Sequence, residues 1–353
     1  MGFSRGHPLG GWIEVAALAE YIGAWPLADI VLRLLIARVD EYTALADARV
    51  PVTPREALAL CWARRGRIAR TAGRLTDADV FYRRAVALTR GLSWSDGRPH
   101  AEMGLAVLSV GRGNYPSAER RAQRVLAYRP VVYSMYRIAA HQVIAFTKRR
   151  RGQPLDALLH SWEAYDLLDR DDDRRFEILS SMSEIAQSHG DLDAAARGFA
   201  AVATSQAPWR VRIPGLVGAL DVALLIAARD SQASRNVLAD ARVQCARAAL
   251  EDALPHVAAP GDRLLGTLAL AQAAVTAGVR EVAELWLRES EELADRHGFH
   301  EKRFRVETLR ASMHSAESLV GNPDGRAAET TTSRRSWSAE HPALARLRTL
   351  AVV

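Results

Sequence analysis

The stretch that decides the fold runs from Cys61 to Ala85 and reads CWARRGRIARTAGRLTDADVFYRRA. In it, Gly66 precedes Gly73 by seven positions, and Ala78 and Tyr82 follow Gly73 by five and nine. Small residues at helical spacing let two helix axes approach to about 8–10 Å. Gly73 can end the first helix because glycine tolerates the left-handed conformation that follows a helix. The stretch therefore predicts a hairpin of two helices that turns at Gly73.

The same spacing recurs along the chain. From Gly73 to Gly190 the corresponding glycines are 40, 39 and 38 residues apart. A fixed period of this kind indicates a repeat array. Trp62, Gly66, Tyr82 and Phe199 align with other positions of the pattern. The glycine–alanine pairs that define it are Gly23/Ala28, Gly73/Ala78, Gly113/Ala118, Gly152/Ala157, Gly190/Ala195 and Gly278/Ala283.

Helix-start signals follow several of these glycines. Pro26, Pro116 and Pro154 lie two or three positions later, where a missing backbone N–H costs nothing. Asn114 and Asp191 can cap the helix that begins there. The chain holds 63 alanines, and alanine is the best helix former. A single hairpin does not bury its apolar face, but stacked hairpins do.

The pattern resembles the tetratricopeptide repeat, Trp-x2-Leu-Gly-x2-Tyr followed by Ala, Phe and Pro. The 61–85 copy departs from it where Arg65 replaces the leucine and Ala69 the tyrosine. The period near 40 exceeds the family's 34 residues and is similar to that of sensor regions in bacterial transcription regulators. The resemblance covers residues 9–310 and weakens between Thr204 and Leu264. It implies an all-α, right-handed superhelix (α-solenoid) of tetratricopeptide-like helical hairpins.

The C-terminal composition predicts a division into three parts. Residues 1–318 form the helical-repeat domain. Residues 319–341, rich in Gly, Pro, Ser, Thr and Arg, are expected to be a flexible linker. Residues 342–353 contain a short amphipathic run. That run is either a frayed terminal helix or a segment that docks into a groove of this chain or of a partner.

Charge and cysteine content narrow the class of protein. The net charge of +6 comes from 47 basic and 41 acidic residues, and only two of the basic residues are lysine. No stretch reaches the roughly 18 uninterrupted apolar residues of a spanning helix, so we expect no membrane association. Two cysteines, Cys61 and Cys245, exclude a disulfide framework. We expect a cytoplasmic protein in which both cysteines are small core residues.

Motifs of catalysis and cofactor binding are missing. Neither Lys148 nor Lys302 precedes the Ser or Thr that a phosphate-binding P-loop requires. The run from His300 to Phe304 lacks the second histidine of the His-Glu-x-x-His zinc pattern. The acidic run Asp171 to Asp173 is interpreted as a solvated turn before a helix. The sequence therefore predicts no catalytic residue, metal or cofactor.

The resemblance also implies where a partner binds, because the first helix of each hairpin lines the concave groove. Guanidinium groups bind carboxylates in two-point contacts, so the hypothesis is recognition of an acidic peptide or protein surface. The alternative is that the arginines form only a solvated face. The groove residues carried over are Arg64, Arg67, Arg70, Met103, Gln142, Phe146, Arg149 and Arg150, with Ala63, Thr71, Val107, Val110 and Gly111 at equivalent positions.

Three other functions stay open. Nucleic acid is the main competing partner, since Arg64 to Arg70 form a basic stripe and Lys148 to Arg151 a basic cluster. A regulatory role, as the signal-sensing subunit of a bacterial transcription or signalling system, is the second. An enzyme assembled from separate repeats is the third, and no motif supports it. The leading interpretation is a non-catalytic adaptor or sensor that binds a peptide or partner protein.

Overall fold

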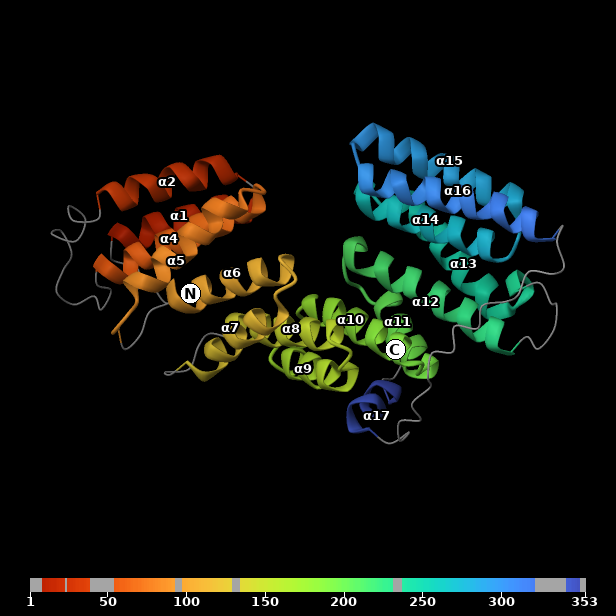
Figure 1. Ribbon diagram of the computed structural model, residues 1–353, viewed down its shortest axis with the longest axis horizontal. Helices are drawn as coiled ribbons and strands as arrows, with labels where there is room; N and C mark the ends of the chain where they lie inside the picture. The colour runs from red at the N-terminus through yellow and green to blue at the C-terminus, as the bar shows by residue number, and fades with distance from the viewer. Residues whose placement is uncertain are drawn as a thin grey trace. The chain divides into compact units, whose positions relative to one another are not determined.

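The computed structural model describes residues 8–22, 24–38, 54–92, 97–128, 134–230, 237–320 and 341–349. Every regular element in these ranges is helical (Figure 1). Contacts divide the chain into two compact units, Met1–Leu168 and Asp169–Val353.

Unit 1 is a stack of four helical hairpins. Each first helix pairs with the helix that follows it, and α4 also packs against α6 and α6 against α8. Stacking of this kind lets each hairpin bury its apolar face on the next. The helices are α1 (Pro8–Tyr21), α2 (Trp25–Ala37), α4 (Pro54–Thr71), α5 (Leu75–Leu88), α6 (Gly97–Gly111), α7 (Tyr115–Ala127), α8 (Ser134–Arg150) and α9 (Pro154–Asp166).

Unit 2 repeats this arrangement. The hairpins are α10–α11, α12–α13 and α14–α15, and α16 packs against α14 and α15. Figure 1 shows α14, α15 and α16 running side by side. A short helix, α17, lies against α11. The bounds are α10 (Arg174–His189), α11 (Leu192–Ala203), α12 (Trp209–Asp230), α13 (Ala241–Ala253), α14 (Pro260–Thr276), α15 (Arg280–His297), α16 (His300–Val320) and α17 (Pro342–Arg348).

The predicted turn glycines have the backbone conformation that their role requires. Each adopts a left-handed φ between the two helices of a hairpin, which an L side chain would strain. Asn114 and Asp191 cap the next helix by accepting from the backbone N–H groups of Ser117 and Ala194. Gly23 lies outside the described residues. The φ angles are 74° for Gly73, 70° for Gly113, 73° for Gly152, 88° for Gly190 and 71° for Gly278.

Burial confirms the packing role of the small-residue positions. The alanines five positions after the turn glycines are completely buried, at Ala28, Ala78, Ala118, Ala157, Ala195 and Ala283. Tyr82 and Phe199 are each 1% exposed, and Trp62 is 8% exposed. Close helix packing around large buried rings supplies the apolar contact area that stabilises each hairpin.

The hairpin geometry continues through the stretch where the sequence pattern weakens. Helices α12 and α13 still pair, and they share a core with α14 that includes Leu220, Leu250 and Leu270. The connection between them includes residues 231–236, which lie outside the described ranges. Burial of apolar side chains therefore maintains the hairpin where the repeating pattern of small residues weakens.

Helix α12 is long and apolar enough to cross a membrane by length and composition alone. It contains Pro214 and Asp221, and 61% of its most apolar window is buried in the structure. It packs against α11, α13 and α14. Those contacts are typical of the core helix of a globular domain, a kind of helix that satisfies the same length and hydropathy criterion.

Asp221 provides a pH-dependent test of this packing. Burial raises the pKa of its carboxyl above the usual 3.8, an effect that Arg305 of α16 opposes. An acid with a raised pKa in the folded state contributes stability at low pH, and that contribution is lost as pH rises above 3.8. We therefore expect Asp221→Asn to raise the midpoint of thermal unfolding at pH 7. The difference should shrink as pH falls towards 3.8, and a lower midpoint at pH 7 would contradict it.

The C-terminal part of the chain divides between described and undescribed residues. Most of the predicted linker at 319–341 lies outside the described residues. The predicted amphipathic run contains α17, whose Ala343, Leu344 and Leu347 are buried. Helix α17 docks on this chain's own α11.

Candidate partner-binding cavity

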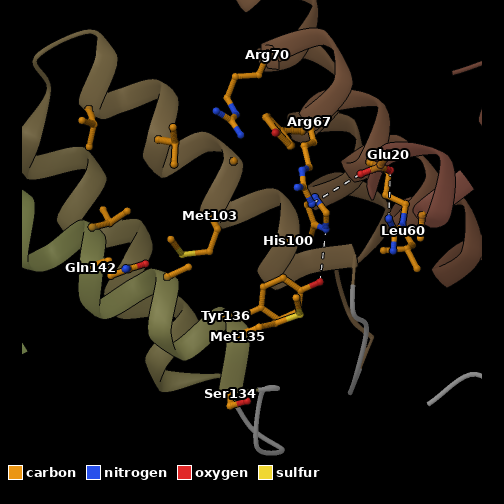
Figure 2. A pocket seen from close by; sticks show the side chains of 18 of the residues that line it. Glu20, Leu60, Arg67, Arg70, His100, Met103, Ser134, Met135, Tyr136 and Gln142 are labelled. Carbon is orange, nitrogen blue, oxygen red and sulfur yellow. Dashed lines mark hydrogen bonds and ion pairs between the residues drawn. The ribbon is translucent and has the colours of Figure 1, made fainter. Parts of the chain in front are cut away.

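A cavity of about 790 Å³ opens in unit 1 among the first helices of its four hairpins. Its lining side chains come from α1, α4, α6 and α8, with Tyr82 contributed by α5. Figure 2 shows the labelled side chains of these helices around the open space. The cavity therefore lies on the side of the stack where the resemblance placed a groove.

One wall of the cavity is apolar. Met103 and Val107 of α6 and Met135, Val143 and Phe146 of α8 line this part of the cavity. Val107 is 36% exposed and Met135 47% exposed. Exposed apolar side chains that gather in a hollow favour a ligand with apolar groups of its own.

The other wall carries charge. Glu20 of α1 is 4% exposed, and its Oε1 accepts from Arg64 Nη1 at 3.1 Å. Its Oε2 lies 3.7 Å from Arg67 Nη1. Arg70 lies one helical turn beyond Arg67 on α4, and no ion pair of Arg70 occurs among the described residues. With Glu14 also in the lining, three arginines and two glutamates leave this wall with a net charge of 3 − 2 = +1.

Three residues that line the cavity also carry buried polar side-chain atoms. The Nε atoms of Arg64 and Arg70 and the Oε2 of Glu20 are buried without a hydrogen-bond partner. All three atoms belong to residues that line the cavity. Buried polar atoms without hydrogen-bond partners cost free energy.

His100 lies between the charged and the apolar walls. Its Nδ1 is 3.4 Å from the hydroxyl of Tyr136 (Figure 2). Burial, together with the positive charges of Arg64, Arg67 and Arg70, lowers the pKa of this imidazole to about 3. His100 is therefore neutral at physiological pH, and the basic character of the cavity comes from arginine alone.

Tyr82 forms the floor of the cavity because two glycines make room for its ring. A Cβ atom on Gly66 of α4 would lie 2.7 Å from the ring, and one on Gly104 of α6 would lie within 2.5 Å of three ring atoms. Burial raises the pKa of the Tyr82 hydroxyl, and a hydrogen bond with Arg70 opposes that shift. Tyr82 thereby links the hairpin core to the charged wall.

The structure brings six of the predicted groove residues together. Arg64, Arg67, Arg70, Met103, Gln142 and Phe146 all line the cavity, as do Val107 and Val110. Arg149 and Arg150 are not among the lining residues, and the Arg150 guanidinium lies over the Phe146 ring at 5.3 Å. Whether the six bind a partner stays a prediction.

The family's groove positions correspond to Ala63, Thr71 and Gly111 in this sequence, but none of the three lines the cavity. Ala63 is completely buried in the core, while Thr71 and Gly111 are exposed at the ends of their helices. The neighbour Arg64 lines the cavity in the place expected for Ala63. The family positions are therefore correct for Arg67 and Arg70 on this helix, and the difference is confined to its Ala63 and Thr71 positions.

Sequence reasoning missed four members of the site. Glu20, His100, Met135 and Tyr136 line the cavity but were not among the predicted residues. Glu20 carries a usable signal, because it lies on the first helix of the first hairpin at the same distance before Gly23 as Arg70 before Gly73. His100 and Tyr136 lie near the starts of α6 and α8, outside the positions that the family pattern assigns to the groove.

The predicted basic stripe and basic cluster are largely neutralised within unit 1. Arg65 Nε donates to Asp29 Oδ1 at 2.9 Å, while Arg64 and Arg67 face Glu20. In the cluster, Lys148 lies 3.2 Å from Glu119 Oε1, and Arg151 donates to the other oxygen of Glu119 at 2.8 Å. These cations offer less attraction to phosphate than their density in the sequence suggests.

The two cysteines have different environments. Cys61 is buried, as predicted, and burial raises the pKa of its thiol to about 12, so it is not a thiolate nucleophile. The interpretation of Cys245 as a core residue is wrong, because it is exposed on α13, two positions from the buried Val243. Among the described residues no group of three or more metal-binding side chains occurs.

Comparison with known proteins defines the fold. No protein-family pattern and no curated protein sequence matches the chain. Among solved structures, a tetratricopeptide repeat protein from Parabacteroides merdae has a TM-score of 0.51 at 14% identity, covering 88% of this chain and 100% of that one. The apo form of RapI has a TM-score of 0.50 at 10% identity, covering 81% of this chain and 97% of that one. The chain therefore has the tetratricopeptide-repeat fold, an all-α solenoid of helical hairpins.

Proposed function

We propose that this chain is a non-catalytic binding protein whose unit 1 cavity takes a segment of a partner protein. The segment would carry a carboxylate next to an apolar side chain. The observation that carries this proposal is the cavity itself, in which Arg67 and Arg70 line one side while Met103 and Phe146 line another. A charged wall and an apolar wall share that cavity.

The chemistry of the two walls sets the features of the ligand. Arg67 has 48% of its side chain exposed, and Arg70, which hydrogen-bonds to Tyr82, also lines the cavity, so both can face a ligand. A carboxylate between two guanidinium groups forms charge-assisted hydrogen bonds, which are stronger than neutral ones. The apolar wall around Met103 and Phe146 would take a side chain next to that carboxylate.

Nucleic acid is the second candidate partner, after a polypeptide. Phosphate binding is driven by unpaired positive charge and needs several cations along a backbone. In this unit the candidate cations Arg64, Arg65, Lys148 and Arg151 already face carboxylates. An apolar wall in the same cavity also favours a polypeptide over a phosphate backbone.

Selection from a peptide library tests the proposal. Random dodecapeptides displayed on phage are panned against the wild-type chain and against a variant with Arg67→Gln and Arg70→Gln. We expect wild-type selection to enrich Asp and Glu together with large apolar residues. The strongest selected peptide should bind the variant at least about tenfold more weakly, because charge-assisted hydrogen bonds contribute about 1.5–3 kcal/mol.

The matched control is a variant with Arg83→Gln and Arg112→Gln. It makes the same change in net charge, and both of these arginines pair with Asp79 outside the cavity. Its binding should equal that of the wild type. Equal binding by the cavity variant, or a selection without acidic enrichment, would refute the proposal. Displacement of the peptide by a single-stranded oligonucleotide, with steep salt dependence, would favour nucleic acid instead.

A further inference from the structure

Helix α17 lies outside the hairpin pattern. It follows α16 after residues 321–340, and it packs against α11, which is more than one hundred residues earlier in the chain. It has only seven residues, whereas isolated helices shorter than about 12–15 residues are marginal in water. Its helical form therefore depends on contact with the surface beneath it.

The contact has an apolar part. Ala343 and Leu344 are each 4% exposed and Leu347 is fully buried, although they belong to a helix at the edge of the unit. Gly198 of α11 lies below Leu347, and a Cβ at that position would be 3.3 Å from Leu347 Cδ1 and 2.0 Å from Ser183 Oγ. Ser183 Oγ therefore fills the position of a Cβ on Gly198, and Leu347 packs beside it on the same surface.

The contact also has a polar anchor. Asp191 is the N-cap of α11, and its Oδ1 accepts from the backbone N–H of Ala194 at 3.1 Å. Its Oδ2 accepts from Arg348 Nη2 at 2.6 Å, with the Asp191 side chain 8% exposed. One carboxylate therefore caps α11 and holds the end of α17. A hydrogen bond between two charged groups is stronger than a neutral one.

We propose that the face of α11 between Asp191 and Gly198 is a docking site for a short amphipathic helix of the pattern Ala-Leu-x-x-Leu-Arg, and that α17 is its tethered occupant. A seven-residue helix buries too little area to bind tightly by itself, but a tether raises its local concentration to about the millimolar range. Helix α17 thus masks the site in cis. A partner helix with the same apolar pair and terminal arginine competes with it.

The test vacates the site in the full chain. A variant with Leu347→Asp and Arg348→Glu loses both the apolar contact and the anchor. A fluorescein-labelled peptide of residues 339–353 is then titrated against wild type and variant, with fluorescence anisotropy as the readout. We expect saturable binding to the variant and at least about tenfold weaker binding to the wild type, in which α17 competes. The same peptide with the two substitutions should bind neither protein.

Two further measurements keep the result unambiguous. Hydrogen exchange of α11 should be faster in the vacated variant than in the wild type. An Ala345→Glu variant changes an exposed residue of α17 and should behave as wild type. Equal peptide binding to wild type and vacated variant, or no binding to the vacated variant, overturns the proposal. So does a wild-type dimer that the vacating substitutions dissociate, because α17 would then occupy a second copy.

Discussion

Replacing Gly104 by alanine is expected to lower the free energy of unfolding of unit 1 by about 2 kcal/mol or more. A Cβ there would lie 2.2 Å from Cζ of Tyr82, whose ring is 1% exposed and faces Gly66 as well. A buried ring between two helices has little room to move, and overpacking a dense core costs about 1–3 kcal/mol. The measurement is chemical denaturation at equilibrium, followed by far-UV circular dichroism.

Gly111 provides the control in the same helix. A Cβ on Gly111 meets nothing within 4 Å, so Gly111→Ala should leave stability unchanged or raise it by up to about 1 kcal/mol through helix propensity. In a Tyr82→Leu background, Gly104→Ala should cost less than it does with the tyrosine present. Equal effects of Gly104→Ala and Gly111→Ala would show that the ring is not confined as the structure indicates.

How much of this arrangement the sequence predicts can be judged from the hairpin around Tyr82. Gly66, Gly73, Ala78 and Tyr82 were placed correctly, because helix contact and a left-handed turn each demand a particular residue size at a particular spacing. Gly104 was not recognised as a partner of the Tyr82 ring. That contact joins two successive hairpins, and its partner lies outside the local spacing pattern.

Arg65 shows why a departure from the family pattern does not weaken the fold. It stands where the family has leucine, yet its guanidinium lies 5.1 Å from the Trp62 ring and 4.5 Å from the Phe81 ring. Its Nε also donates to Asp29. An arginine stem can cover apolar surface while its head pairs with an acid, so it replaces leucine between two rings.

The charge of the cavity is the feature that sequence reasoning described least well. Positions on α4 predicted three arginines on one face, and the structure places all three in the lining. The repeat spacing places Glu20 at the position that Arg70 has in the next hairpin, but it does not predict that Glu20 pairs with Arg64 across 44 positions of chain. Cavity charge is a sum over residues brought together by the fold, whereas local spacing identifies each helix face separately.

We expect Glu20→Gln to lower the free energy of unfolding and to raise the affinity for an acidic peptide. The substitution keeps the size of the side chain but leaves Arg64 and Arg67 without their shared carboxylate. Removing one partner of a buried ion pair is destabilising. Because Arg67 is half-exposed and solvent screens it, we expect a loss of about 2 kcal/mol, below the full value for a completely buried pair.

The same substitution should strengthen binding of an acidic peptide selected by the wild-type chain. The net charge of the lining rises from +1 to +2 when Glu20 is neutral, and a competing carboxylate leaves the site. A gain of about tenfold corresponds to 1.4 kcal/mol, which is within the range of one charge-assisted hydrogen bond. Fluorescence anisotropy at fixed ionic strength measures the change in affinity.

Glu102→Gln separates a binding effect from a stability effect. Glu102 is also 4% exposed and pairs with two arginines, Arg121 at 2.7 Å and Arg124 at 3.7 Å, but it does not line the cavity. The Glu102→Gln variant should have a lower free energy of unfolding than the wild type, as Glu20→Gln does. Its affinity for the acidic peptide should stay at the wild-type value. If both variants bind the peptide with unchanged affinity, the peptide carboxylate does not contact the arginines beside Glu20. If Glu20→Gln weakens binding, Glu20 contacts the ligand directly, and the cavity recognises a cation beside the carboxylate.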